Sequence, residues 1–147
     1  MNSVHTNQAK SVADVSMTPE GRLVILGAAE SGVGAALLGL AKGWEVFVSD
    51  SGNIKPVYKT MLVEAGIAFE EGGHSEEKIV NADCIVKSPG IPEKAEIMKK
   101  IRAKGIRVES EIEFGFRYKG DSKIIAITGS NGKSTTTKLC YHLLKDG

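Results

Sequence analysis

Short apolar runs alternate with stretches of helical periodicity, and this alternation constrains the fold more than any other feature of the sequence. Residues 22–26 form one such run, which ends at Gly27 as a strand buried on both faces does. The sequence therefore predicts an α/β domain with a doubly wound, Rossmann-like parallel sheet and helices on both faces. Further strands are predicted at 44–49, 67–69, 83–87 and 106–108, and helices at 31–42, 56–65, 93–104, 109–118 and from an N-cap at Ser75.

The turns that follow these predicted strands contain residues suited to binding a ligand. Gly27 follows the first strand, Asp50 the second and Ser88 the fourth. The carboxyl ends of parallel strands lie at one edge of a sheet, and doubly wound domains bind their ligands there. These three positions are therefore expected to share one site.

Composition and charge are those of a soluble globular protein. Hydrophobic residues make up 41% of the 147 residues, and the net charge of +1 (19 Lys and Arg against 18 Asp and Glu) gives no electrostatic case for a nucleic-acid or membrane partner. Residues 1–20 are polar and lack the apolar core of a secretory signal, so we expect a mobile leader, or an extension ahead of a start near Met17, on a cytoplasmic protein. Cys84 and Cys140 are expected to be buried, reduced thiols.

The most specific motif is TGSNGKST at residues 128–135, which lies between a strand predicted at 123–127 and a helix predicted at 133–145. Glycines let backbone N–H groups turn toward a phosphate, and the helix N-terminus adds partial positive charge. Lys133 would reach the outer phosphates of ATP, and the Ser134 hydroxyl would bind Mg²⁺. The motif departs from GxxxxGK[ST] because Ile127 occupies the first glycine position. The alternative is a glycine turn that caps a helix.

After the linker at 119–122, this strand, P-loop and helix read as the start of a second α/β domain. A single strand and helix cannot bury their own apolar faces, so the second domain is expected to be truncated.

The first strand–helix turn has the frame of GxGxxG, with Gly27 and Gly32 at its ends but Ala29 in the middle. A methyl group at that position argues against tight NAD binding, because the middle glycine lets the backbone approach a pyrophosphate. A diphosphate could still bind at the helix N-terminus near Ser31. The alternative is that the glycines serve close strand–helix packing. Asp50 could contact a ribose or cap its own loop, and residues 88–90 could be an ordinary Pro-Gly turn.

With these motifs in this order, residues 22–147 resemble the Mur ligases of peptidoglycan precursor synthesis. The segment TGSNGKSTTT at 128–137 is similar to the ATP loop of that family and accounts for the missing first glycine. Asn131 and the turn Ser88-Pro-Gly-Ile91 resemble those of the D-glutamate-adding branch.

The resemblance implies an ATP-dependent amide ligase of cell-wall biogenesis, and so of cell shape and division. It would join D-glutamate to UDP-N-acetylmuramoyl-L-alanine through an acyl phosphate, with ATP and Mg²⁺, as a cytoplasmic monomer. Residues 21–119 would be the UDP-substrate domain and 120–147 the start of the ATP-binding domain. Lys133 and Ser134 would be catalytic, with Ser134 on Mg²⁺. The UDP substrate would contact Glu30, Ser31, Gly32, Asp50, Ser51, Ser88, Pro89 and Gly90, and ATP would contact Gly129, Ser130, Asn131, Gly132, Lys133, Ser134 and Thr135.

The chain departs from the family pattern at two positions of the UDP pocket. Ala29 stands where a glycine is common, and Gly52 stands where a basic residue would help to clamp the uridine. The fragment alone is expected to be inactive, since the D-glutamate domain and the remaining Mg²⁺ ligands would lie beyond Gly147. Two other functions stay open from the sequence: a nicotinamide-binding domain of an oxidoreductase, and a stand-alone nucleotide-binding module.

Overall fold

The computed structural model describes residues 21–145. Its strands form one sheet in the order β3-β2-β1-β4-β5, and every neighbouring pair is parallel. The predicted doubly wound sheet is therefore confirmed. The elements are β1 (Arg22–Leu26), α1 (Glu30–Ala41), β2 (Glu45–Ser49), α2 (Pro56–Glu64), β3 (Ala68–Glu70), α3 (Glu76–Ile79), β4 (Cys84–Lys87), α4 (Glu96–Ala103), β5 (Arg107–Ser110), α5 (Glu111–Arg117) and α6 (Lys133–Lys145).

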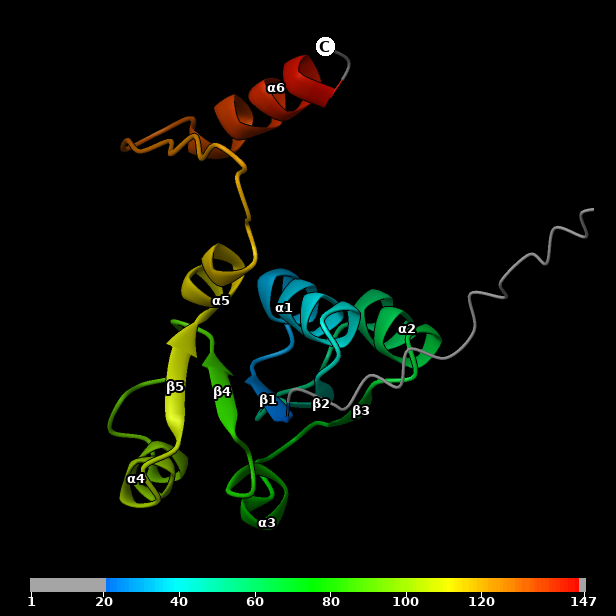
Figure 1. Cartoon of the computed structure of the whole chain (residues 1–147), viewed down its shortest axis with the longest axis vertical. Helices are drawn as coiled ribbons and strands as arrows, with labels where there is room; N and C mark the ends of the chain where they lie inside the picture. The colour runs from blue at the N-terminus through cyan, green and yellow to red at the C-terminus, as the bar shows by residue number, and fades with distance from the viewer. Residues whose placement is uncertain (1–20, 146–147) are drawn as a thin grey trace, which may run out of the picture.

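Helices cover both faces of the sheet, as Figure 1 shows. On one face α1, α2 and α5 pack against Leu23 and Ile25 of β1, and on the other α3 and α4 pack against Val24 and Leu26. All four of these β1 side chains are fully buried. Burial on both faces is the reason that β1 reads as a continuous apolar run rather than an alternating one.

The starts of α4 and α5 differ from their prediction, whereas Ser75 stands at the N-cap of α3 as predicted. The Ser75 side chain makes no capping bond, and its backbone N–H donates to Glu70 Oε1 at 2.8 Å. The capping box belongs instead to α5, where Ser110 Oγ accepts from the Glu113 N–H and Glu113 accepts from the Ser110 N–H. Residues 109 and 110 consequently end β5 rather than begin the helix, and α4 starts only at Glu96.

The strand predicted at 123–127 is wrong for this chain. These residues form no ladder with any strand of the described region, and Ile124 and Ile125 are about 60% exposed. A β-strand needs a neighbour for its backbone N–H and C=O groups, and within residues 21–145 none pairs with this segment. The leader predicted at 1–20 lies outside the described residues.

Helix α6 forms where it was predicted, but it has no buried residue and stands apart from the sheet in Figure 1. The apolar side chains Leu139, Leu143 and Leu144 are exposed, and Cys140 is only partly buried rather than buried as predicted. Cys84 is buried in β4, and both cysteines are free thiols. No helix within 21–145 has the length and apolar character needed to cross a membrane.

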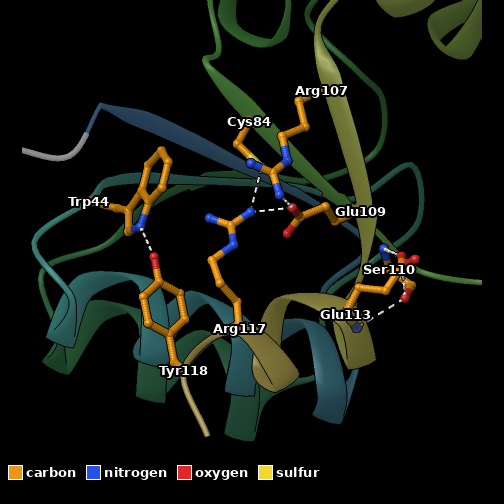
Figure 2. A network of polar contacts seen from close by, with 8 residues as sticks. All are labelled: Trp44, Cys84, Arg107, Glu109, Ser110, Glu113, Arg117 and Tyr118. Atoms are coloured by element: carbon orange, nitrogen blue, oxygen red, sulfur yellow. Dashed lines mark hydrogen bonds and ion pairs between the residues drawn. The ribbon is translucent and has the colours of Figure 1, made fainter. Parts of the chain in front are cut away.

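Polar contacts fasten α5, the last helix before the linker, to the sheet (Figure 2). The Glu109 carboxylate of β5 accepts from Arg117 of α5 and pairs with Arg107, and its side chain is only 9% exposed. The hydrogen bond from Arg117 to Glu109 raises the pKa of the guanidinium, which stays charged. Trp44 Nε1 also donates to Tyr118 Oη at 2.8 Å. Tertiary contacts thus fix the end of α5.

Replacing Glu109 by alanine is expected to lower the free energy of unfolding by about 2 kcal/mol, because it leaves the partly buried Arg117 guanidinium without its carboxylate. Urea denaturation of the chain measures the change. Glu45→Ala is the control, since Glu45 pairs with Arg22 at the surface with a side chain 64% exposed. Its loss should cost less than about 0.5 kcal/mol. Equal losses in the two variants would contradict a special role for the Glu109 pair.

Candidate functional site

The carboxyl edge of the sheet brings together the three turns predicted to form the UDP pocket. Strand β1 lies between β2 and β4, so the turns after these strands are neighbours. Gly27 has a φ of 101°, and a Cβ placed on it would lie 2.8 Å from Ser88 Cβ. The two turns therefore meet where the strand order reverses, which is the place where doubly wound domains bind ligands.

Gly32 packs the first turn of α1 directly on the end of β1. A Cβ on Gly32 would lie 2.0 Å from the carbonyl oxygen of Gly27, closer than any side chain can approach. The packing role considered for these glycines is therefore real. The same close contact places the N-terminus of α1 at the sheet edge. Its N-cap residue is Ala29, whose side chain has no polar atom to satisfy the first N–H groups of the helix.

These N–H groups at the start of α1 make a place for an anion. Glu30 and Ser31 of the same turn are exposed. Ser31 also lines a groove of about 420 Å³ between α1 and α5, together with Glu111 and Ile112. Glu111 Oε1 is buried, has no partner among the described residues, and would lie 3.6 Å from a Cβ on Gly32. A carboxylate thus faces the first turn of α1, and no sequence motif indicated it because Glu111 follows a different strand.

Asp50 braces the first turn. Its Oδ2 accepts from the Ala28 N–H at 2.7 Å, and its Oδ1 accepts from the Gly52 N–H at 2.8 Å. The carboxylate therefore links the turn after β1 to the loop after β2, which also contains the exposed Ser51. Each oxygen keeps acceptor capacity for a ligand hydroxyl. The two sequence interpretations of Asp50, loop cap and ribose contact, are compatible in this geometry.

Lys87, which the sequence motifs did not single out, organises the turn at residues 88–90. Its Nζ donates to the Ile91 carbonyl at 2.9 Å and pairs with Glu93 Oε1 at 3.2 Å, although its side chain is only 13% exposed. The Ser88 carbonyl also accepts from the Ile91 N–H at 3.1 Å. Pro89 and Gly90 are exposed at the tip. A lysine that ends a buried strand beside a Pro-Gly turn was the available signal.

The predicted ATP loop lies away from this edge, so the structure does not bring the two groups of predicted residues together (Figure 1). Gly129 and Gly132 have φ values of 151° and 77°, and α6 begins at Lys133. Lys133 Nζ donates to the Gly129 carbonyl at 2.5 Å, which closes the loop on itself. The remaining predicted residues, Ser130, Asn131, Ser134 and Thr135, are all exposed on this loop and the first turn of α6.

Comparison with known proteins identifies the family of the sheet domain. Residues 23–97 match the family model described as the MurD N-terminal domain. The chain belongs to this family. The match spans β1 through the start of α4, and so includes the turns that follow β1, β2 and β4.

Two curated relatives extend the likeness of this MurD-family chain past residue 97. UDP-N-acetylmuramoylalanine--D-glutamate ligase of Cytophaga hutchinsonii is 63% identical over 124 residues, and that of Bacteroides thetaiotaomicron is 58% identical over 124 residues. Each alignment covers 84% of this chain and 28% of the relative. The chain therefore spans little more than a quarter of the length of these relatives.

A solved structure shares the fold of this chain. The murein peptide ligase of Psychrobacter arcticus superposes with a TM-score of 0.73 at 28% identity, over 85% of this chain and 26% of that one. The likeness in structure therefore covers more of the chain than residues 23–97 alone.

Proposed function

We propose that this chain is the UDP-substrate domain and the first part of the ATP-binding domain of a ligase that adds D-glutamate to UDP-N-acetylmuramoyl-L-alanine. One observation carries the proposal: a MurD-family domain places three turns at the switch point of its sheet and is followed by a GKS loop that starts a helix. The high identity to two D-glutamate ligases supports it. Residues 21–119 and 120–147 are the two parts.

The chemistry of such a ligase needs an activated carboxylate. A carboxylate is a poor electrophile until one of its oxygens becomes part of a phosphate leaving group. The carboxylate oxygen therefore first takes the γ-phosphoryl group of ATP, which gives an acyl phosphate and releases ADP. The amine of D-glutamate then attacks the acyl carbon, and phosphate leaves. The work of this chain would be to hold UDP and to hold the outer phosphates of ATP.

The sheet edge is suited to hold the UDP part. The uncapped N–H groups at Glu30, Ser31 and Gly32 would face the diphosphate. Asp50 and Ser51 would face the uridine, and the turn of Ser88, Pro89 and Gly90 would close the pocket. The Asp50 carboxylate is held in place by the Ala28 N–H for this role. Gly52 has no side chain to clamp the uridine, and Ala29 adds a methyl group beside the diphosphate. We therefore expect a lower affinity for UDP than in a site with the family pattern at these two positions.

The loop at residues 129–135 has the residue types needed to bind a nucleoside triphosphate. Lys133 is exposed, and among the described residues its ammonium bonds only the Gly129 carbonyl, which a phosphate oxygen could replace. The Ser134 hydroxyl stands in the first turn of α6, where Mg²⁺ on the outer phosphates would be bound. Mg²⁺ would supply charge neutralisation for the transferring phosphoryl group. Gly129, Ser130, Asn131, Gly132 and Thr135 would supply backbone and side-chain contacts.

Titration of the ¹⁵N-labelled chain tests the UDP site. UDP-N-acetylmuramoyl-L-alanine is expected to shift the amide signals of Ser31 and Asp50, whereas NADH should shift neither above background. Ser31→Asp should weaken binding about fivefold by placing a negative charge beside the diphosphate. Thr60→Asp introduces the same charge at an exposed position of α2 and should leave binding of the UDP substrate unaltered.

Shifts at these two amides with NADH alone would overturn the ligase assignment in favour of a nicotinamide-binding domain.

The proposed reaction consumes ATP, a cytoplasmic metabolite, which supports a cytoplasmic enzyme. The proposed monomeric state is tested by sedimentation of the chain.

A further inference from the structure

Ser49, Glu70 and His74 form a compact hydrogen-bonded group behind the uridine side of the edge. Ser49 ends β2 immediately before Asp50 and is fully buried. Its Oγ lies 2.7 Å from Glu70 Oε1, at the end of β3, and 2.7 Å from His74 Nδ1. One hydroxyl thus connects two polar side chains, and no motif in the sequence uses any of the three.

The number of available protons fixes the direction of both bonds. Burial raises the pKa of Glu70, but bonds from the Ser75 side chain and backbone, Ser49 and Lys78 outweigh it and lower that pKa to about 2. Glu70 is therefore ionised near neutral pH and can only accept. Ser49 has one hydroxyl proton, which must go to Glu70. Ser49 Oγ then accepts, and His74 Nδ1 must carry the donating hydrogen.

This argument selects one tautomer of His74. The neutral ring must be protonated on Nδ1, which leaves Nε2 as an acceptor. A doubly protonated ring also carries hydrogen on Nδ1, so the contact with Ser49 is retained in both charge states. The hydrogen bonds among Ser49, Glu70 and His74 therefore keep the same geometry whichever charge state the ring has, and the group does not act as a pH switch.

The group is tied to the uridine loop by backbone bonds on both sides. The Asp50 N–H donates to the Glu70 carbonyl at 3.1 Å. From the segment between Glu70 and His74, the Gly72 N–H donates to the Gly52 carbonyl at 3.0 Å, and the Gly73 N–H donates to the Asp50 carbonyl at 3.3 Å. A displacement of His74 would move residues 72–73, and with them the loop that presents Asp50.

We propose that Ser49, Glu70 and His74 are positioning residues for the loop at 50–52, with His74 locked as the Nδ1–H tautomer, and that this lock sets the affinity for a uridine diphosphate. The inference rests on the proposed function, since it assumes that this loop faces the uridine. None of the three residues needs to touch the nucleotide.

Two-bond ¹H–¹⁵N correlation spectra of the imidazole rings test the tautomer directly in the unaltered chain. His74 is expected to show the Nδ1–H pattern, whereas the exposed His142 of α6 should show the Nε2–H form that predominates in free histidine. An Nε2–H pattern at His74 would overturn the proposal without any variant being made.

Binding of UDP by matched variants tests the consequence. His74→Phe removes the donor and should weaken binding by about three- to tenfold, because Ser49 Oγ keeps its bond to Glu70 but loses the hydrogen bond that it accepts from His74, and the segment at 72–74 is no longer anchored. His74→Asn places an amide N–H near the position of Nδ1–H and should restore affinity to within about twofold. The same two changes at His142 should have no effect.

The outcomes separate the two proposals. If the unaltered chain binds no UDP, the proposed function fails and the positioning role falls with it. If the unaltered chain binds UDP and His74→Phe binds equally well while folded, only the positioning role is overturned. Should His74→Phe fail to fold, the ring spectra and the His74→Asn variant still decide. A folded His74→Asn variant that binds UDP about three- to tenfold more weakly than the unaltered chain would contradict the proposal.

Discussion

If the chain belongs to the proposed ligase, replacing Lys133 by alanine in that full-length enzyme is expected to lower D-glutamate-dependent phosphate release on the order of 10²- to 10³-fold, because one cation is removed from the transferring phosphoryl group. The ammonium is exposed and, within residues 21–145, is bonded only to the Gly129 carbonyl at 2.5 Å, so its loss should not unfold the loop. Release of inorganic phosphate with and without D-glutamate measures the effect.

Lys138→Ala is the matched control, because Lys138 is exposed on the same helix and lies outside the loop. It should retain nearly full turnover. Turnover retained by the Lys133 variant would show that the GKS segment caps a helix and binds no triphosphate, which is the alternative that the sequence left open.

Replacing Gly32 by alanine is expected to lower the free energy of unfolding by about 3 kcal/mol, because the added methyl group would meet backbone that cannot move aside. The Cβ would lie 2.0 Å from the Gly27 carbonyl oxygen, so α1 must shift away from β1. Urea denaturation measures the loss, and binding of UDP should fall with it because the first turn of α1 is displaced.

Gly34→Ala, two residues further along α1, is the control with the opposite sign. A Cβ there meets nothing within 4 Å, and the residue is exposed in a helix interior. Alanine should therefore raise stability by about 0.5 to 1 kcal/mol. A Gly32 variant as stable as the Gly34 variant would show that the first turn of α1 is not tightly seated on the sheet.

The strands and helices of the sheet domain were predictable because each has a local pattern. Strand β1 is buried on both faces and so reads as an apolar run, and α1 ends near Gly43, whose φ is 86°. The positions of Gly27, Asp50 and Ser88 at one edge followed from the parallel order alone. These inferences need only period, chirality and turn chemistry.

Predictions failed where hydrogen-bond partners, rather than residue type, decide where an element begins or whether it forms. Ser75 is the N-cap of α3 as its residue type predicts, but its side chain makes no capping bond. Helix α5 starts at Glu111 rather than at residue 109, because Ser110 and Glu113 form a capping box there. Residues 123–127 have the composition of a buried strand but have no neighbour in the described part of the chain with which to pair. Local preference in each case yielded to the available hydrogen-bond partners.

The sequence by itself determined the parallel α/β architecture, the edge that holds the turns, and the family resemblance at the GKS loop, because periodicity and motif spacing are properties of neighbouring residues. Only the tertiary structure decided what the polar side chains do. It placed Asp50 on the Ala28 N–H, set Glu111 beside the start of α1, and joined Ser49 to His74. These contacts link residues more than 20 positions apart, and only the packed sheet and its helices bring them within hydrogen-bonding reach.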